Sequence, residues 1–284
     1  MRFYLFIFII SFCYSNFSYQ SLLLPNSNYD LVSGYSQYSI FNKFTSDKKN
    51  NSYISSSILS FPKGINLHSI EYFSFPFNYH NYFNINIIDY GQFTDSESDI
   101  QFSAQDIILK NYLTIPIKNK FYTLVGLNYI NSNIANYSSS ALCINFSLFI
   151  NFKNLLLQAG FNNYGLIIKH YTSYNEVLPM YKSLSIMYRP QYLNSIIGLQ
   201  YNSFDYYNMS SFFGELFISD NYSIIAGYTS LAQKLYFEDF STNFFTGFSI
   251  GLNVNYRDYI LNIGIKNLGS IGLINSITLN KSFN

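Results

Sequence analysis

Most of the chain alternates apolar and polar residues, one for one, over stretches of about ten residues. A period of two is typical of a β-strand whose two faces meet different surroundings. In the segment 142–152, one face carries Leu142, Ile144, Phe146, Leu148, Ile150 and Phe152, and the other carries Cys143, Asn145, Ser147, Phe149 and Asn151. An unbroken apolar face of this length suits a tilted strand that crosses the hydrocarbon layer of a membrane, for which about 9–11 residues suffice.

Two further segments follow the same pattern. Residues 250–266 predict a hairpin, because Ile250, Leu252, Val254 and Tyr256 and then Tyr259, Leu261, Ile263 and Ile265 alternate with mostly polar or small residues. Its turn falls near Arg257 and Asp258, and such short turns are usual on the periplasmic side of a membrane barrel. Residues 121–130 place Phe121, Thr123, Val125, Leu127 and Tyr129 on one side.

The second face of these strands separates a membrane barrel from a soluble sandwich. It carries Asn, Gly, Ser and Gln, whereas a soluble sandwich would turn Lys, Glu and Asp toward water. A sheet in lipid must close on itself, because unpaired backbone groups at an open edge find no water. The alternating stretches therefore predict an all-β fold: a transmembrane antiparallel up-and-down β-barrel of roughly fourteen strands, forming one domain.

Composition supports a membrane location. Aromatic residues make up 20% of the chain and charged residues 11%, well under the ~25% that is usual for soluble domains. The one long apolar run lies at the N-terminus, which excludes a bundle of membrane helices. Abundant Tyr near predicted strand ends fits the aromatic girdles found at membrane interfaces; these residues are Tyr112, Tyr129, Tyr188, Tyr201 and Tyr228.

Residues 1–18 are predicted to be a signal peptide. Arg2 precedes a short apolar run over 3–12, and cleavage after Ser15 or Ser18 would satisfy the need for a small residue before the scissile bond. The alternative, an N-terminal anchor helix, would need about 20 apolar residues. Residues 19–284 are then the outer-membrane β-barrel domain, in which Cys143 is the single cysteine, so no intramolecular disulfide is expected. Clusters of Ser, Asn and Asp predict loops at 45–52, 94–98, 171–176, 205–211 and 238–243.

The sequence offers little catalytic chemistry. His68, His80 and His170 lie on separate predicted strands or loops and lack ligand spacing. Cys143 has no evident base or cation beside it and is expected to be an inert, half-buried thiol. We therefore predict no enzymatic activity and no catalytic residue.

Ligand-binding motifs are equally weak. Asp95, Glu97 and Asp99 alternate in one loop and could hold Ca²⁺, although a solvated loop is the preferred interpretation. The glycines at 264, 269 and 272 lack the strand–turn–helix setting of a phosphate-binding loop. A net charge of +1 gives no case for nucleic acid. The prediction is no metal, no cofactor and no nucleic acid, with ligand and partner contacts unassigned.

Several motifs nevertheless occur in a familiar order. Residues 89–94 (DYGQFT) and 102–106 (FSAQD) resemble the "YG…F-S-A-x-D" stretch of the PorV/PorQ family of outer-membrane proteins. Residues 126–132 (GLNYINS) and 136–142 (NYSSSAL) are similar to the strand that follows, and 176–179 (EVLP) resembles the family's E-x-L-P element. Residues 247–251 and 272–276 are similar to the PorQ-type C-terminus. The family's early Gly-rich segment and Asn-Pro-Ala element, which belong to a plug-like region, have no recognisable counterpart between Ser21 and Ile65.

The resemblance implies a barrel related to the FadL-like transporters and a role in the type IX secretion system. Such a protein would help to attach or present exported cargo proteins at the cell surface. Its partners would be other secretion-complex proteins and exported cargo domains, together with outer-membrane lipid. The alternative is a FadL-like outer-membrane transporter of hydrophobic small molecules.

Overall fold

A computed structural model describes residues 19–34, 52–75, 79–94, 101–118, 120–172, 176–205, 207–230 and 245–283. The predicted signal peptide and the acidic trio at positions 95, 97 and 99 lie outside these ranges, so both remain predictions. The fourteen strands are β1 (Ser52–Ser60), β2 (Asn66–Ser74), β3 (His80–Thr94), β4 (Gln101–Lys118), β5 (Phe121–Ile134), β6 (Tyr137–Asn151), β7 (Leu155–Lys169), β8 (Tyr181–Tyr188), β9 (Ser195–Phe204), β10 (Asn208–Ser219), β11 (Tyr222–Thr229), β12 (Phe248–Tyr256), β13 (Tyr259–Asn267) and β14 (Leu273–Phe283).

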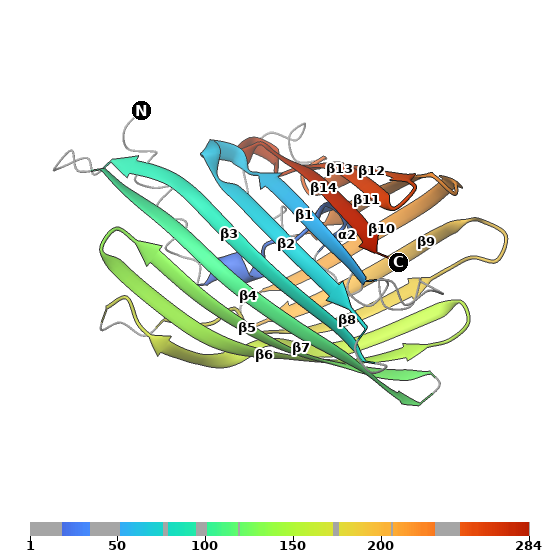
Figure 1. Ribbon diagram of the computed structural model, residues 1–284, viewed down its shortest axis with the longest axis horizontal. Helices are drawn as coiled ribbons and strands as arrows, with labels where there is room; N and C mark the ends of the chain where they lie inside the picture. The colour runs from blue at the N-terminus through green and yellow to red at the C-terminus, as the bar shows by residue number, and fades with distance from the viewer. Residues whose placement is uncertain are drawn as a thin grey trace.

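The strands form one closed barrel (Figure 1). Each strand pairs antiparallel with its neighbours in the chain, and β1 pairs with β14 to close the sheet. The predicted architecture and strand number are thus confirmed. Among the described residues, no helix has the length and apolar character needed to cross a membrane.

The two ends of the barrel differ. At one end, called the turn end, strands are joined by short connections such as 152–154, 220–221 and 257–258. At the other, called the loop end, β3, β7 and β11 end, and the stretches of sequence that separate them from the next strands are long, with residues 95–100, 170–180 and 230–247; the other stretches at this end are short. Short turns are usually periplasmic in outer-membrane barrels and longer loops extracellular, which predicts that the turn end faces the periplasm.

The alternation in the sequence sorts side chains between lipid and lumen as predicted. In β6, Ile144, Phe146 and Leu148 point outward and are exposed, while Asn145 and Ser147 point inward and are buried. The hairpin of β12 and β13 turns at Arg257 and Asp258, with Tyr256 opposite Tyr259. A shift of one residue would carry every apolar side chain from the lipid to the lumen, so the alternation also fixes the register.

The lumen is filled rather than open, and it is less uniformly polar than the alternation implies. One apolar cluster lies toward the turn end and includes Phe73, Tyr82, Leu124, Phe149 and Phe213. A second lies toward the loop end and includes Leu59, Leu67, Ile88, Ile108 and Ile130. Buried Asn and Ser side chains occupy much of the remaining inward face.

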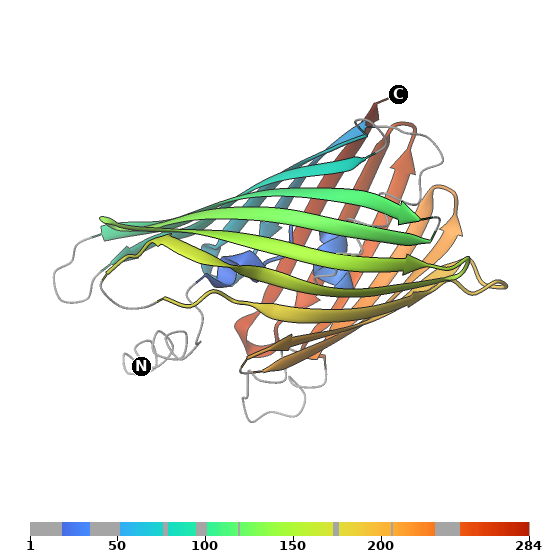
Figure 2. The same ribbon diagram turned by 90° about the horizontal axis from the view of Figure 1, so that it is seen from below.

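Residues 19–34 lie inside the barrel and form a plug. They comprise a 3₁₀ turn, η1 (Gln20–Leu23), and a short helix, α2 (Asn28–Ser33). Figures 1 and 2 both show this segment enclosed by the strands, and α2 contacts β10 to β14. The sequence predicts no plug between Ser21 and Ile65, whereas the structure shows that residues 19–34 form one.

Two details of the predicted strands and loops are corrected. Tyr112 is not a girdle residue: it points into the lumen, is buried, and packs against the Tyr82 ring at 5.8 Å between centroids. Tyr188 and Tyr201 are exposed on the outward face, as expected. The predicted loop at 205–211 is shorter than expected, because β10 already begins at Asn208.

The lipid-facing surface gives a direct test of the fold. We expect Ile144→Lys, at the middle of β6, to lower the free energy of unfolding in vesicles by about 2–4 kcal/mol, because lysine near the bilayer midplane must be desolvated. Tyr137→Lys, at the loop end of the same strand, is the control and should change it little. Denaturant titration, followed by heat-modifiable gel mobility, measures the free energy of unfolding of both variants. Equal losses in the two variants would contradict the placement of Ile144 at the middle of the bilayer.

Candidate functional site in the barrel lumen

The plug folds locally through helix-capping residues. The Ser27 side chain accepts a hydrogen bond from the backbone N–H of Asp30 at 3.4 Å, which caps the start of α2. Gly34 ends the helix in the left-handed conformation, with φ 87°, and its N–H donates to the carbonyl of Asp30 at 3.1 Å. A side chain at Gly34 would also overlap Ser211, so both the conformation and the space require glycine.

Three glycines on the lumen face make room for α2. Gly227, Gly251 and Gly264 lie on the adjacent strands β11, β12 and β13, and Gly251 is paired directly with Gly264. A Cβ on Gly227 would overlap the carbonyl oxygen of Val32, and one on Gly264 would overlap the Asn28 side chain. We call these three residues the glycine track, because they let the helix approach the backbone of the wall.

Hydrogen bonds join α2 to the same part of the wall. The backbone N–H of Asn28 donates to Thr278 Oγ1 at 3.0 Å, and Ser276 Oγ donates to Asn28 Oδ1 at 2.6 Å. Ser249 Oγ donates to the carbonyl of Val32 at 3.0 Å. These bonds satisfy polar groups that would otherwise be buried without partners, which stabilises the docked position of the plug.

The residues before α2 are held by the opposite wall. Lys110 Nζ and Asn86 Nδ2 each donate to Asn26 Oδ1 at 2.7 Å, and both side chains are buried. Lys110 also interacts electrostatically with Asp30 and Glu71. A buried ammonium group is costly unless it is paired and hydrogen-bonded, so Lys110 strongly favours the position in which Asn26 and Asp30 lie beside it.

Several polar side chains at the loop end hold Tyr19, the first described residue of the plug. The Tyr19 hydroxyl donates to Glu176 Oε2 at 2.8 Å and also contacts Ser139 Oγ. Ser139 Oγ lies 2.7 Å from the same carboxylate oxygen, and the backbone N–H of Tyr171 donates to the other one at 2.8 Å. His170 lies at the edge of this group, with Nδ1 3.8 Å from Glu176 Oε2.

Tyr171 links Glu176 to a neighbouring carboxylate. The hydroxyls of Tyr171 and Ser132 contact each other, Ser132 contacts Asp106, and Tyr90 donates to Asp106 Oδ2 at 2.9 Å. Burial raises the pKa of Tyr171 to about 12; the bond to Ser132 opposes that rise, and the charges of Asp106 and Glu176 add to it. Burial likewise raises the pKa of Tyr19.

We call the residues joined by these hydrogen bonds at the loop end the latch cluster: Tyr19, Tyr90, Asp106, Ser132, Ser139, Tyr171 and Glu176.

The barrel wall is interrupted beside the latch cluster. Pairing of β7 with β8 ends at Asn162 and Tyr181, and β7 then continues to Lys169. Within the described chain, residues 164–169 pair only with β6. The change coincides with a β-bulge at Asn163, which has φ 58° and donates from its backbone N–H to Asn145 Oδ1 at 2.9 Å.

An irregular segment, 176–180, follows the interruption. Asn163 Nδ2 donates to the carbonyl of Pro179 at 3.3 Å, which holds this segment to the bulge. Leu178 is buried in the apolar cluster of the loop end, in which Ile167 of β7 and Leu22 of the plug also pack. Apolar side chains therefore lie on the lumen side of the place where the wall loses a strand pairing.

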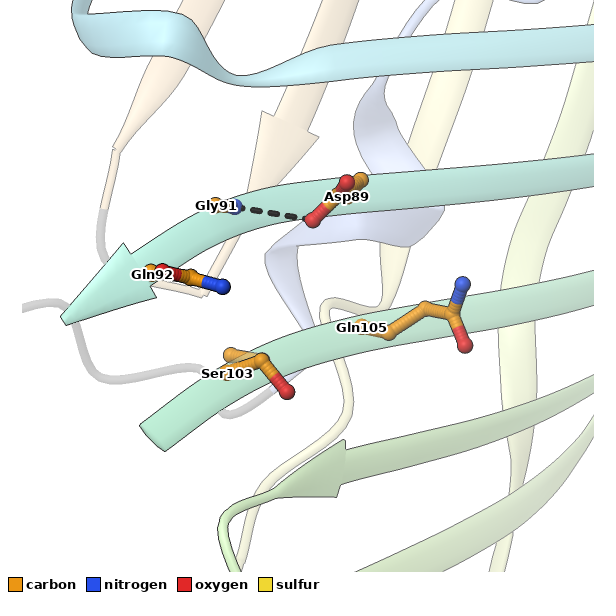
Figure 3. Close-up of a pocket in the computed structure, with 6 residues that line it drawn as sticks. Asp89, Gly91, Gln92, Ser103 and Gln105 are labelled. Atoms are coloured by element: carbon orange, nitrogen blue, oxygen red, sulfur yellow. Dashed lines mark hydrogen bonds between the residues drawn. The ribbon is translucent and has the colours of Figure 1, made fainter. Parts of the chain in front are cut away.

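A polar cavity of about 280 Å³ lies on the outer side of the same barrel end. Asp89, Gly91, Gln92, Ser103 and Gln105 line it, as Figure 3 shows, along with Ala104. The backbone N–H of Gly91 donates to Asp89 Oδ1 at 2.9 Å. The next outward pair toward the turn end is Ile87 and Ile107, which are apolar, whereas Asp89 and Gln105 at the cavity are polar. The outer surface of the wall therefore changes from apolar to polar at the cavity.

The structure separates the residues considered for chemistry. His68 is exposed on the outward face opposite Ile58 and Ile87. His80 packs against the Phe75 ring at 4.8 Å between centroids, and Cys143 is fully buried in the loop-end cluster. Within the described ranges, no three His, Cys, Asp or Glu side chains form a group that could hold a metal ion.

The sequence does not predict the latch cluster as a site, although it carries a signal for it. Tyr90, Asp106, Ser132, Ser139 and Glu176 fall in five separate stretches that the sequence analysis singles out: 89–94, 102–106, 126–132, 136–142 and 176–179. These stretches are far apart along the chain and meet at one end of the lumen. Tyr19 and Tyr171 lie outside the motifs and are identified only by the structure.

Comparison with known proteins places the fold. No protein-family model matches the chain, and no curated protein matches its sequence. Among solved structures, the CymD monoaromatic hydrocarbon channel is similar over 95% of this chain and 94% of its own, with a TM-score of 0.59 and 10% identity.

Two TodX structures are also similar. The Pseudomonas putida toluene transporter TodX covers 91% of this chain and 94% of its own, with a TM-score of 0.53 and 9% identity. A TodX mutant described as a monoaromatic hydrocarbon channel covers 90% and 97%, with a TM-score of 0.55 and 9% identity. The protein is thus an outer-membrane β-barrel with the FadL/TodX-like fold of fourteen strands.

The glycine track predicts how the plug can be displaced. We expect Gly264→Val to expel α2, because the new side chain overlaps Asn28, and to make Cys143 reactive toward a water-soluble maleimide. Gly214→Ala is the control, since its Cβ would meet nothing closer than 4.0 Å. Both variants should keep heat-modifiable mobility. Unchanged labelling of Cys143 in a folded Gly264→Val barrel would contradict the role of the track.

The latch cluster predicts an alkaline transition. The pKa of Tyr171 in the folded protein lies above the usual value near 10, so the neutral hydroxyl contributes stability that is complete below pH 10 and is lost as pH rises through about 12. Subtracting the tyrosinate absorbance of Tyr171→Phe from that of the unmodified protein should show an ionisation near pH 12. A midpoint near 10 would rule out burial of this hydroxyl.

Proposed function

We propose that the protein is a non-enzymatic outer-membrane channel for small hydrophobic molecules. The observation that carries the proposal is the end of strand pairing between β7 and β8 at Asn162 and Tyr181, which lies beside the apolar cluster of the loop end. The lumen of the same barrel is occupied by the plug. A filled lumen hinders hydrophilic solutes. A route lined by Leu178 and Ile167 favours apolar ones, because it removes apolar surface from water.

Solved structures that share this fold are described as channels for the same class of substrate. The CymD and TodX structures are described as channels or transporters for monoaromatic hydrocarbons and toluene, and they share the barrel over nearly the whole chain. Sequence identity of 9–10% supports the architecture alone, so the substrate proposal depends on the lumen of this protein.

Uptake across an outer membrane tests the proposal. A phospholipid vesicle is a poor assay, because small apolar molecules cross it unaided. We therefore choose a Gram-negative host that lacks its own hydrocarbon channel and measure the initial rate of radiolabelled toluene uptake. Expression of the protein should raise this rate several-fold, and a rate equal to that of the empty host would contradict the proposal.

A matched pair of variants tests the route. We expect Leu178→Lys to reduce uptake to near the host background, because it places a charge among the apolar side chains beside the interruption. Val177→Lys adds the same charge one residue away, at an exposed position, and should leave uptake unchanged. Heat-modifiable mobility must be retained by both. Equal uptake by the two variants would exclude a route past Leu178.

A second candidate is a component of the type IX secretion system that attaches or presents secreted cargo. The observation that favours it is the convergence of the PorV/PorQ-like motif stretches in the latch cluster at the loop end. Here secretion-complex proteins and exported cargo domains would be the partners, and the connections around Glu176 their contact region. Deletion of the gene should then leave cargo unattached at the cell surface, with toluene uptake unaffected; normal attachment would reject this candidate.

A further inference from the structure

Exposed cations gather at the turn end of the barrel. We call them the basic rim; its members are Lys118, Lys120, Lys153, Arg189, Arg257 and Lys281. The exposed acids at this end, within the described part of the chain, are Asp220 and Asp258, while Glu215, which interacts electrostatically with Arg189, is buried. Six cations against two acids give this rim an excess of positive charge that the net charge of the whole chain conceals.

The loop end does not share this excess. Its exposed lysines in the described ranges are Lys63, Lys169 and Lys182, and its exposed acids are Asp89 and Asp205. The barrel is therefore electrically asymmetric along its axis. A protein with a net charge of +1 can still present a strongly basic surface to one compartment or one leaflet.

Aromatic rings hold several of the rim cations on the outer wall. Lys120 Nζ lies 5.6 Å from the centroid of the Phe152 ring, and the Arg257 guanidinium carbon lies 5.3 Å from that of Tyr256. Lys281 Nζ lies 5.5 Å from the centroid of Tyr259 and 5.5 Å from that of Phe283. All four of these cation–π contacts lie at the turn end.

The rings also set the depth of these charges. Phe152, Tyr256, Tyr259 and Phe283 are exposed on the outside of the barrel, where aromatic side chains mark the boundary between hydrocarbon and headgroups. A cation that packs on such a ring lies at the height of lipid phosphates. Its charge faces outward around the wall, and not into the lumen, where Lys110 and Lys266 are buried.

We propose that the basic rim binds the phosphate-bearing headgroups of anionic phospholipids in the leaflet that surrounds the turn end. Charge complementarity selects this partner, because each Lys or Arg near an anionic bilayer surface strengthens the attraction by about fivefold. The binding is independent of what passes through the barrel. It orients the protein in the membrane and gives it a shell of anionic lipid.

Bound-lipid analysis tests the proposal. The mature protein is reconstituted in equimolar phosphatidylglycerol and phosphatidylcholine and extracted in mild detergent, and the retained lipids are measured by mass spectrometry. We expect phosphatidylglycerol to be enriched several-fold over phosphatidylcholine at low salt. The enrichment should fall toward equality in high salt, because exposed charges are screened over a few ångströms there.

Matched triple variants assign the enrichment to the rim. Lys120→Gln with Arg257→Gln and Lys281→Gln should bring the lipid ratio close to one, whereas Lys63→Gln with Lys169→Gln and Lys182→Gln should keep the enrichment. Both must show heat-modifiable mobility. If the rim variant does not fold, Lys118→Gln with Lys153→Gln, which alters no ring-packed cation, should still reduce the enrichment.

Three results would overturn the proposal. The first is equal retention of the two lipids by the unmodified protein at low salt, which would leave the rim to solvent or to a protein partner. The second is an enrichment that does not respond to salt. The third is an equal loss in the loop-end variant, which would show that total charge, and not its position, controls lipid retention.

Discussion

Satisfaction of backbone hydrogen bonds in a medium without water is the constraint on which this structure depends. A strand in lipid has no solvent to pair with its free edge, so β1 must meet β14 and the sheet must close. Closure then fixes two faces for every strand. The outward face contacts hydrocarbon, and on the inward face hydrogen bonds among buried Asn and Ser side chains and the backbone of the plug take the place of water.

The same constraint explains the composition of the place where the wall is interrupted. Where β7 loses β8 as a partner, side-chain amides take over: Asn163 bonds to the carbonyl of Pro179, and its own N–H bonds to Asn145. Asn162 donates to Ser183 Oγ at 3.0 Å on the β8 side. Asn side chains thus supply hydrogen bonds at the bulge and beside it, where the regular pairing of β7 with β8 ends.

The sequence predicts the wall better than it predicts the interior. Alternation over 142–152 determines which side chains face lipid, because one physical difference, hydrocarbon against polar lumen, acts on every second residue. Residues 19–34 carry no such period, so their position depends on contacts with strands more than 200 residues away. Inward glycines such as Gly227 were the available signal, since a strand gains nothing from glycine unless something approaches its backbone.

Tyr112 shows a different limit of prediction. An amphipathic ring suits both a membrane interface and a crowded lumen, so composition alone could not assign it to either. The latch cluster shows the reverse: Asp106 and Glu176 stand out in short sequence motifs, but only the closed sheet brings them to the same end of the lumen. Short motifs mark separate stretches of the chain, and the topology decides which of these stretches meet.

The plug also has a consequence for the order of folding. Asn28 hydrogen-bonds to Thr278, which lies 250 residues later in the chain, and to Ser276, 248 residues later. The earliest described segment therefore depends on the last strand, β14, for its docking site. Contacts of such long range form late, because the intervening loop must close first. Ring closure of the sheet and capture of the N-terminal segment are thus expected to be one concerted event at the end of assembly.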